Sequence, residues 1–406
     1  MSWNAVERGA SNNCPRLQAW LSLQDASPSQ SRSNAGLGTL EDRLEAEAAR
    51  LRLARRRLIW IESADVAATR SAVRLAALCD ATIHVAQSPG ERNLSAVIGS
   101  SGFLGTSLSE VHQRAELVVH LGGDHLDSMP MLAPRFLDGN PTDGRKARQQ
   151  LIVGQDPAWS RGSWLDQFTK VLLALRRAID SGRPFDSAVG SPNDGYSSSP
   201  EQFAHLLLSS RSTVFLWSEA EFADEIDRLL LERVLEIAQV LSQFTRCTLL
   251  PLSIDPGRVT AKETLLWLTN LAGTARHLNG GEWIQPTEGF DQSLASWQAA
   301  YDWILCLRNL PSDRPLPDLR FDFVLDAHSN ANHHRWLAGS ESREVLFLPV
   351  AAVGLDCGGH LTRVDHALGA YVCGQREHEP LAPRACAVLD ALADCLSNPR
   401  DEWRGD

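Results

Sequence analysis

Short apolar strand patterns alternate with amphipathic helix patterns along most of this 406-residue chain. The first occurrence is a buried strand at 58–63, a helix at 68–80 and a second strand at 81–86. A strand, a helix and a strand at this spacing predict a βαβ unit with parallel strands. Because the alternation continues to the carboxyl end, we expect an α/β protein in which helices cover largely parallel sheets.

Capping signals indicate where two of the helices begin. Thr39 and Asp42 predict a capped helix near the start of the first domain. Ser218 and Glu221 predict a capping box for a long helix whose acidic residues form a solvated face. The pattern also predicts a helix over 292–309. Further strands are expected at 116–121, 212–218, 247–253, 321–329 and 344–354.

Length and low-complexity segments predict the domain organisation. Single cores stop growing near ~250–300 residues, so a chain of this length should form two or three domains. Residues 1–37 read as an extension, because 24–37 are polar and rich in serine. Residues 187–200 form the clearest linker.

Charge and cysteine usage exclude some classes of function. A formal net charge of −11 argues against a general nucleic-acid binder, which needs a basic face. The 8 cysteines include no CxxC pair, so neither a zinc ribbon nor a four-cysteine iron–sulfur motif is present. We expect reduced, buried thiols in a cytoplasmic protein, without a signal peptide or a transmembrane helix.

The stretch "IHVAQSPGERN" (83–93) leaves a strand and enters an expected loop that starts at Ser88 and Pro89. Loops at the carboxyl ends of strands hold ligands and metals in open α/β sheets. This loop contains neither cysteine nor histidine after the strand. It therefore offers no nucleophile or soft metal ligand.

Two glycine-rich stretches are candidate binding loops. In "HLGGDHLDS" (120–128), Gly123 and Asp124 follow a strand, where glycines let a ligand approach the backbone; a tight strand-to-helix turn is the alternative. In "LPVAAVGLDCGGHLTRVD" (348–365), Gly359 precedes Arg363 and Asp365. Arg363 could bind an anionic cofactor, or it could pair with Asp365 to order a turn.

Two adjacent histidines, His333 and His334, are better explained as surface residues than as a metal site. No HxH or HExxH pattern accompanies them. No GxSxG elbow or Ser–His–Asp arrangement is readable either. The residues by themselves therefore predict no catalytic centre.

The order of these pieces resembles one family, the B subunit of formylmethanofuran dehydrogenase. The resemblance rests on "GTLEDRLEAEAARL", "TSLSEVHQRAELVVHLGGDHLDSMPMLAPRF", "FDFVLDAHSN" and "LPVAAVGLDCGGHLTRVDHAL", and it runs from Gly38 to the carboxyl-terminal helix. It implies the molybdopterin oxidoreductase (formate dehydrogenase-like) fold, with one α/β domain inserted in another. The inserted domain would be 85–199, and the host domain would be 38–84 plus 200–400.

The chain departs from that family at both redox centres. The family carries a cysteine-rich iron–sulfur motif near its amino terminus, where this chain has only Cys14. The family's loop after the second strand carries a cysteine or selenocysteine that ligates molybdenum or tungsten. Here Ser88 and Pro89 stand in that loop, and neither replaces a soft thiolate. We expect no metal, no catalytic residue, and loss of molybdopterin, molybdenum or tungsten and the iron–sulfur cluster.

A chain without these centres resembles the B subunit of the bacterial formyltransferase/hydrolase complex. That resemblance implies a complex that passes a formyl group from tetrahydromethanopterin to a methanofuran-type carrier and releases it as formate. Its partners would be a zinc-dependent, amidohydrolase-like A subunit, a C subunit and a formyltransferase D subunit. This chain would then be a scaffold or a carrier-binding subunit.

Two alternatives stay open at this point. One is an active molybdenum or tungsten subunit that uses Cys79 or Cys357 as an unusual metal ligand. The other is a vestigial pocket that binds a pterin or a polyglutamate chain, such as the glutamate-rich tail of the methanofuran-type carrier. The candidate residues of that pocket are Gly123, Asp124, Gly359, Arg363 and Asp365.

Overall fold

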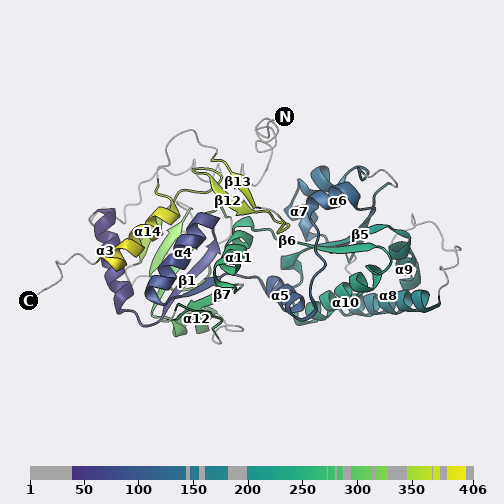
Figure 1. Ribbon diagram of the computed structural model, residues 1–406, viewed down its shortest axis with the longest axis horizontal. Helices are drawn as coiled ribbons and strands as arrows, with labels where there is room; N and C mark the ends of the chain where they lie inside the picture. The colour runs from purple at the N-terminus through teal and green to yellow at the C-terminus, as the bar shows by residue number, and fades with distance from the viewer. Residues whose placement is uncertain are drawn as a thin grey trace, which may run out of the picture. The chain divides into compact units, whose positions relative to one another are not determined.

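The computed structural model of the chain divides into two compact units (Figure 1). Unit 1 is Met1–Ala86, Gly257–Thr362 and Gly369–Asp406; unit 2 is Gln87–Pro256 and Arg363–Leu368. The structure describes residues 39–142, 147–154, 161–181, 199–271, 273–278, 281–286, 294–312, 316–327, 345–367, 369–374 and 382–398. The expected extension at 1–37, the linker over 187–198 and the two adjacent histidines at 333 and 334 lie outside these residues.

Unit 1 contains a seven-stranded mixed sheet. Its order is β11 (Leu346–Pro349), β10 (Phe323–Asp326), β9 (Trp303–Arg308), β1 (Arg57–Ser63), β2 (Thr82–Val85), β7 (Thr274–His277) and β8 (Trp283–Ile284). The first five are parallel, whereas β7 and β8 add to the edge in antiparallel fashion. A two-stranded antiparallel ribbon, β12 (Gly359–Thr362) and β13 (Gly369–Val372), completes the strands described in this unit.

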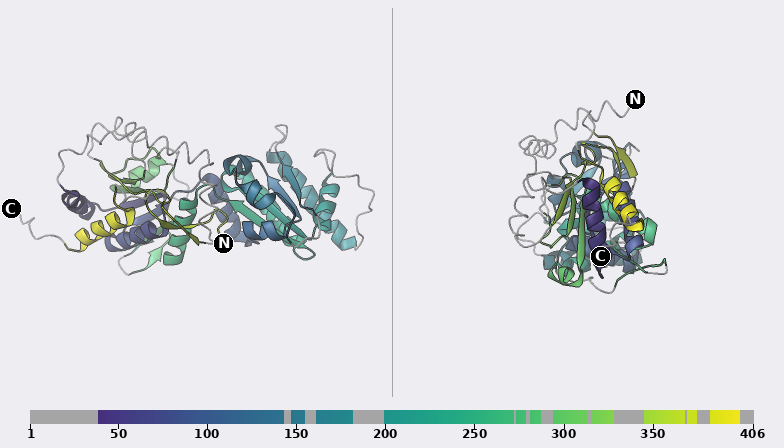
Figure 2. Two further views of the ribbon diagram at one scale, coloured as in Figure 1. Left: turned by 90° about the horizontal axis from the view of Figure 1, so that it is seen from above. Right: turned by 90° about the vertical axis from the view of Figure 1, so that its left-hand side faces the viewer.

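Helices cover both faces of this sheet because its buried residues point alternately to either side. One face packs on α3 (Leu40–Leu53), α4 (Val66–Cys79), α11 (Pro256–Thr269) and α14 (Ala385–Ser397). Figures 1 and 2 show α3 and α14 side by side, although they come from opposite ends of the chain. The other face packs on Trp297 of α12 (Leu294–Ala300). Thr39 and Asp42 form the expected capping box of α3.

The prediction of a single helix over 292–309 is wrong for its second half. Helix α12 ends at Ala300, and Trp303–Arg308 form β9, between β1 and β10. All residues of β9 are buried. Pairing on both sides satisfies their backbone groups, and this tertiary gain outweighs the local helical pattern.

Unit 2 contains a four-stranded parallel sheet. Its order is β4 (Gln149–Val153), β3 (Leu117–Leu121), β5 (Ser212–Ser218) and β6 (Arg246–Leu252). One face packs on α5 (Pro89–Ser101), α8 (Arg161–Ser181), α9 (Pro200–Ser209) and α10 (Glu225–Leu241). The other face packs on α6 (Leu108–Arg114) and a short π-helix, Ala133–Leu137. The expected α/β class is confirmed.

The boundaries of the units differ from those of the expected domains. Residues 200–256 are expected in the host domain, but β5 and β6 pair with β3 in unit 2. Unit 2 therefore continues to Pro256. The serine-rich linker separates α8 from α9, and the structure assigns both of these helices to unit 2.

The observed capping box of α10 lies six residues later in the sequence than the expected one. Ser218 ends β5, and Glu219–Glu221 form a 3-10 turn. Helix α10 begins after Asp224, whose N–H donates to Asp227 Oδ2 at 2.9 Å. Asp227 is therefore a buried cap rather than part of a solvated face.

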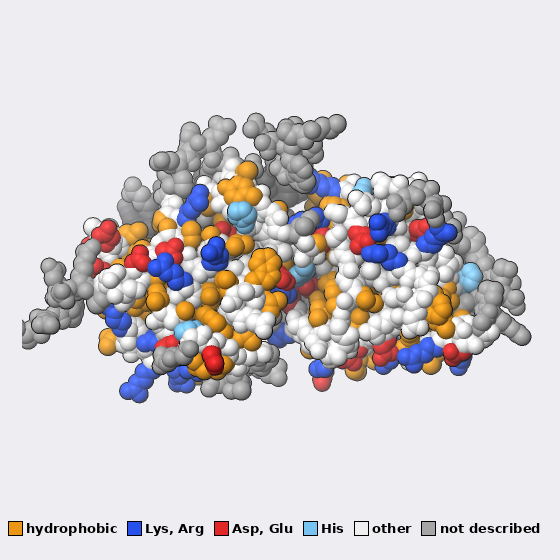
Figure 3. All heavy atoms as spheres, viewed as in Figure 1, with side chains coloured by type: hydrophobic (Ala, Val, Ile, Leu, Met, Phe, Trp, Pro, Cys, Tyr) orange, Lys and Arg blue, Asp and Glu red, His pale blue; other side chains and the backbone are white. Residues whose placement is uncertain are grey.

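The surface shows mixed charge. Acidic and basic side chains are interspersed over the face seen in Figure 3. The expectation that the chain does not bind nucleic acid stays a prediction. Among the described helices, none has the length and apolar character needed to cross a membrane.

The expected loop at 88–93 is the first turn of α5. Ser88 is the N-cap: its Oγ accepts from the Glu91 N–H at 3.2 Å, and its own N–H donates to Glu91 Oε2 at 2.5 Å. Pro89 occupies the first helical position, where its missing N–H has no cost. Gly90 packs on backbone, because a Cβ there would lie 1.9 Å from the Glu219 carbonyl oxygen.

This packing predicts opposite effects for two glycines of α5. Gly90→Ala should lower the free energy of unfolding by about 1–3 kcal/mol, because the added methyl group meets backbone atoms. Gly99→Ala should raise it by about 0.5–1 kcal/mol, because alanine favours the helix and no heavy atom lies within 4 Å of the added carbon. Urea unfolding followed by fluorescence measures both. Equal effects of the two substitutions would contradict this packing.

Candidate functional site

In the sheet of unit 1, the chain adds its next strand on one side of β1 and later strands on the other side, so β1 is the point where the strand order reverses. Strand β2 lies on one side of β1, and β9 lies on the other. In open α/β sheets, ligands bind outside the carboxyl ends of the strands at such a point. Asp65 follows β1 there, and Asn309 follows β9. These two residues mark the candidate site of unit 1.

Asp65 and Asn309 bind each other instead of facing an open crevice. The Asn309 Nδ2 group donates to Asp65 Oδ1 at 2.8 Å, and the Asp65 N–H donates to Asn309 Oδ1 at 3.1 Å. Asp65 Oδ1 also accepts from the Ala68 N–H at 3.0 Å and so caps α4. Both residues are buried. The pair therefore joins the ends of the two central strands.

A buried ion pair lies beside them. Arg308 at the end of β9 donates from Nε to Asp326 Oδ1 at 2.9 Å and from Nη2 to Oδ2 at 2.6 Å. Burial alone would lower the pKa of Arg308, but the hydrogen bonds and charge of Asp326 outweigh it and raise this pKa. This bidentate geometry holds β9 to β10 at their carboxyl ends.

The segment 350–359 lies against these strand ends. The Val353 N–H donates to the Asn309 carbonyl at 2.9 Å, and the Val350 N–H donates to that of Asp326 at 3.0 Å. A Cβ at Gly359 would lie 2.9 Å from Asp65 Oδ2. Gly359, a predicted site residue, therefore lies at the switch point, where it permits close packing on Asp65.

Unit 2 has a second switch point, between β3 and β5. Gly122 follows β3 with a φ of 77°, and a Cβ there would lie 1.4 Å from Glu221 Oε1. Glycine is favoured here because of the positive φ, and the end of the Glu221 side chain occupies the space beside it. Glu219 is also buried, and its Oε1 lies 3.0 Å from His366 Nε2. Acidic side chains therefore lie at this switch point.

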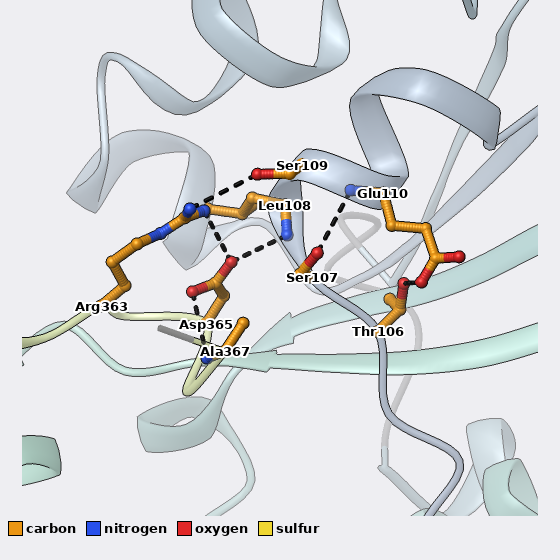
Figure 4. A network of polar contacts seen from close by, with 8 residues as sticks. All are labelled: Thr106, Ser107, Leu108, Ser109, Glu110, Arg363, Asp365 and Ala367. Atoms are coloured by element: carbon orange, nitrogen blue, oxygen red, sulfur yellow. Dashed lines mark hydrogen bonds and ion pairs between the residues drawn. The ribbon is translucent and has the colours of Figure 1, made fainter. Parts of the chain in front are cut away.

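Arg363 and Asp365 form a contact network within unit 2 (Figure 4). Asp365 Oδ2 accepts from Arg363 Nη2 at 2.7 Å and from the Leu108 N–H at 2.8 Å. Arg363 Nη1 also lies 3.4 Å from Ser109 Oγ. Asp365 is buried, while the Arg363 side chain is 26% exposed. The pair thus orders the start of α6 and the 363–367 turn.

The predicted site residues are divided between the two units. Gly359 belongs to unit 1, whereas Gly123, Asp124, Arg363 and Asp365 belong to unit 2. Asp124 is exposed at the start of the five-residue helix α7 (Asp124–Ser128). In the described part of the chain, no hydrogen bond or ion pair joins Gly123 or Asp124 to Arg363 or Asp365.

The residues after β2 do not fit a molybdenum or tungsten site. The family implies a thiolate there, but the Ser88 hydroxyl is a hard ligand and is engaged in capping α5. Over the described ranges, no three His, Cys, Asp or Glu side chains cluster in a way that could hold a metal ion.

The two candidate thiols offer no obvious replacement. Cys79 ends α4, at the amino end of β2, and donates to the Leu75 carbonyl at 3.1 Å. Burial raises its pKa to about 12. Cys357 lies in the segment that contacts the switch point, and burial also raises its pKa. Burial therefore favours the protonated thiol at both positions, whereas metals bind the thiolate.

A buried histidine pair at the end of β3 is not singled out by the sequence. His120 Nδ1 lies 2.8 Å from His125 Nε2, and His120 Nε2 lies 3.1 Å from Gln150 Oε1. The Gln150 oxygen must accept, so His120 carries its proton on Nε2 and accepts at Nδ1 from His125. His125 Nδ1 is then a bare lone pair, and no described group bonds to it. Burial lowers the pKa of His125 to about 3 and lowers that of His120.

The sequence carries only a weak signal for the polar groups at the switch points. Asp65 and Asn309 each follow an apolar strand by one or two residues, which is a usual place for site residues. The signal is lost for Asn309 because the local pattern of its strand favours a helix. Glu219 is hidden because it falls within an expected helix start.

Comparisons with known proteins identify a similar solved structure but no family. No protein-family model matches the chain, and no curated protein matches it. The similar structure is the X-ray crystal structure of the formyltransferase/hydrolase complex (FhcABCD) from Methylorubrum extorquens in complex with methylofuran. The likeness has a TM-score of 0.69 and 21% sequence identity, and it covers 89% of this chain and 97% of that chain. At this identity the likeness shows a shared fold.

The Arg308–Asp326 pair predicts a large effect of removing one partner. Arg308→Met leaves a buried carboxylate uncompensated and should lower the free energy of unfolding by about 3–5 kcal/mol. The control, Arg74→Met, removes an exposed pairing with Asp390 and Asp394 and should cost less than about 1 kcal/mol. Chemical unfolding compares them. Similar losses for both variants would contradict a structural role of the buried pair.

The buried pair of His120 and His125 predicts that the free energy of unfolding decreases at acidic pH. A folded pKa below the unfolded value of 6.5 means that the unfolded chain binds more protons as the pH falls. The stability is therefore complete above about pH 6.5 and falls below it by up to about 1.4 kcal/mol per pH unit for each histidine. His125→Gln keeps a donor toward His120 and should flatten this slope between pH 6.5 and 4. An unchanged slope in urea-unfolding measurements would count against the pair.

Proposed function

We propose that this chain is a non-catalytic, B-type component of a formyltransferase/hydrolase complex. In that complex, a formyl group passes from tetrahydromethanopterin to a methanofuran-type carrier and leaves as formate. The chemistry belongs to the partners, which are an amidohydrolase-like A subunit with zinc and a formyltransferase D subunit, beside a C subunit. This chain serves as a scaffold in the cytoplasm and retains a formate dehydrogenase-like fold.

The shared fold is the observation that carries the proposal. The likeness to a chain of the FhcABCD complex spans nearly the full length of both chains. Because 89% of the chain is more than either unit contains, the match extends over parts of both α/β units. A short shared motif or a single common domain would not explain a match of this extent.

The residues at the metal position support the non-catalytic part. Ser88 caps α5 where the redox family places its metal ligand, and Asp65 and Asn309 bind each other at the switch point of unit 1. Each of these polar groups has an identified structural partner. These interactions explain why polar residues occupy these positions, and the explanation requires neither a metal nor a pterin.

The carrier is a proposed ligand of this chain, with Arg363 as the contact to test. Its guanidinium is partly exposed and retains donors beyond those used by Asp365 and Ser109. A charge-assisted contact to an acidic carrier contributes about 1.5–3 kcal/mol. Arg363→Ala in the assembled complex should therefore weaken carrier binding by about tenfold or more, whereas Arg177→Ala should not change it.

Purification of the tagged chain from its own cells tests the proposal. We expect an amidohydrolase-like protein and a formyltransferase to co-purify, and the assembly to release formate from formyl-tetrahydromethanopterin in the presence of the carrier. Ser88→Ala removes the cap at a cost of about 0.5–2 kcal/mol. It should leave this formate release within about twofold of the unmodified complex.

Two results would overturn the proposal. Purification without such partners would remove the role in the complex. Dye-linked oxidation of the formylated carrier by the assembly would support the alternative, an active dehydrogenase component with an unusual metal ligand. Loss of that oxidation in Cys357→Ser would then identify the ligand.

A further inference from the structure

Unit 2 contains a hollow at the amino edge of its sheet. It has a volume of about 610 Å³ and is widely open to solvent. It lies where α10 turns into β6, beside the bridge between Gly105 and Leu249. The carboxyl edge, with its switch point, is at the other end of the strands. The lining residues are Leu104, Arg211, Ser242, Gln243, Phe244, Thr245, Arg246, Cys247 and Thr248.

Two arginines give the hollow a positive charge. Arg246 forms an ion pair with Glu110, so its charge is largely offset. Arg211 is exposed, and its backbone N–H donates to Glu116 Oε2. Its guanidinium makes no hydrogen bond or ion pair with the part of the chain that the structure describes. The lining therefore carries about one uncompensated positive charge.

Gln243 is a further polar residue of the lining. Ser242 also lines the hollow, but its hydroxyl already donates to the Ala238 carbonyl at 2.6 Å. The Thr245 Oγ1 atom has almost no accessible surface, so a ligand in the hollow does not contact it.

One side of the hollow is apolar and aromatic. Phe244 is 56% exposed, and Leu104 lies in the same lining. A flat ring packed on Phe244 would remove apolar surface of both from water. The lining thus combines one aromatic surface with one available guanidinium.

We propose that this hollow binds a small aromatic carboxylate. The Arg211 fork holds the carboxylate, and the ring lies against Phe244. A monoanion matches the single uncompensated charge better than a phosphate dianion does. The site is separate from the switch points and does not depend on the proposed function.

The test uses 4-fluorobenzoate as the probe and the intact chain, with binding followed by ¹⁹F line broadening. We expect 4-fluorobenzoate to bind at least tenfold more tightly than the neutral 4-fluorobenzamide. Arg211→Ala should weaken benzoate binding about tenfold, and Phe244→Ser should weaken it as well. Arg177→Ala, on an exposed part of α8, should leave the affinity unchanged.

Three outcomes would overturn the proposal. These are no broadening at millimolar probe, equal binding of the acid and the amide, or an Arg211→Ala variant with unchanged affinity. Because Arg211 and Phe244 are exposed, both variants should unfold at the same temperature as the unmodified chain. That measurement separates loss of binding from loss of fold.

Discussion

The hydrogen bonds between Asp65 and Asn309 fix the centre of unit 1. They join β1 to β9 where the sheet changes direction, and Asp65 at the same time caps α4. A buried carboxylate without these donors would cost several kcal/mol. The segment 350–359 depends on the same pair, since it bonds to the Asn309 carbonyl and needs glycine beside Asp65. One interaction therefore organises the strands, the helix and the covering loop.

In unit 2, too, polar side chains at the carboxyl ends of the central strands contact other parts of the same unit. Glu221 takes the space beside Gly122, and Glu219 pairs with His366. In an open α/β sheet these positions normally face a ligand. Here they contact other parts of the same chain, including the 363–367 turn that Asp365 and Arg363 hold to α6. These polar groups therefore have interaction partners within unit 2 itself.

Local pattern in the sequence predicts the features that depend on neighbouring residues, and it misses those that depend on tertiary contacts. The α/β class and the cap at Thr39 follow from periodicity and short-range hydrogen bonds. Strand β9 does not, because its pairing partners lie far away in the sequence. The role of Ser88 as a cap depends on Glu91 three residues later, so it is readable from the sequence, although the expected loop there hides it. The pairing of β5 with β3 and β6 is likewise not readable from the local pattern, which carries no information on sheet order.

We propose that this chain is part of the complex without carrying a metal of its own. Elemental analysis of the purified native assembly by mass spectrometry tests this proposal. We expect zinc that is attributable to the partner, and molybdenum, tungsten and iron far below one atom per copy of this chain. One molybdenum or tungsten per copy would contradict it, and would mean that the chain holds a metal centre after all.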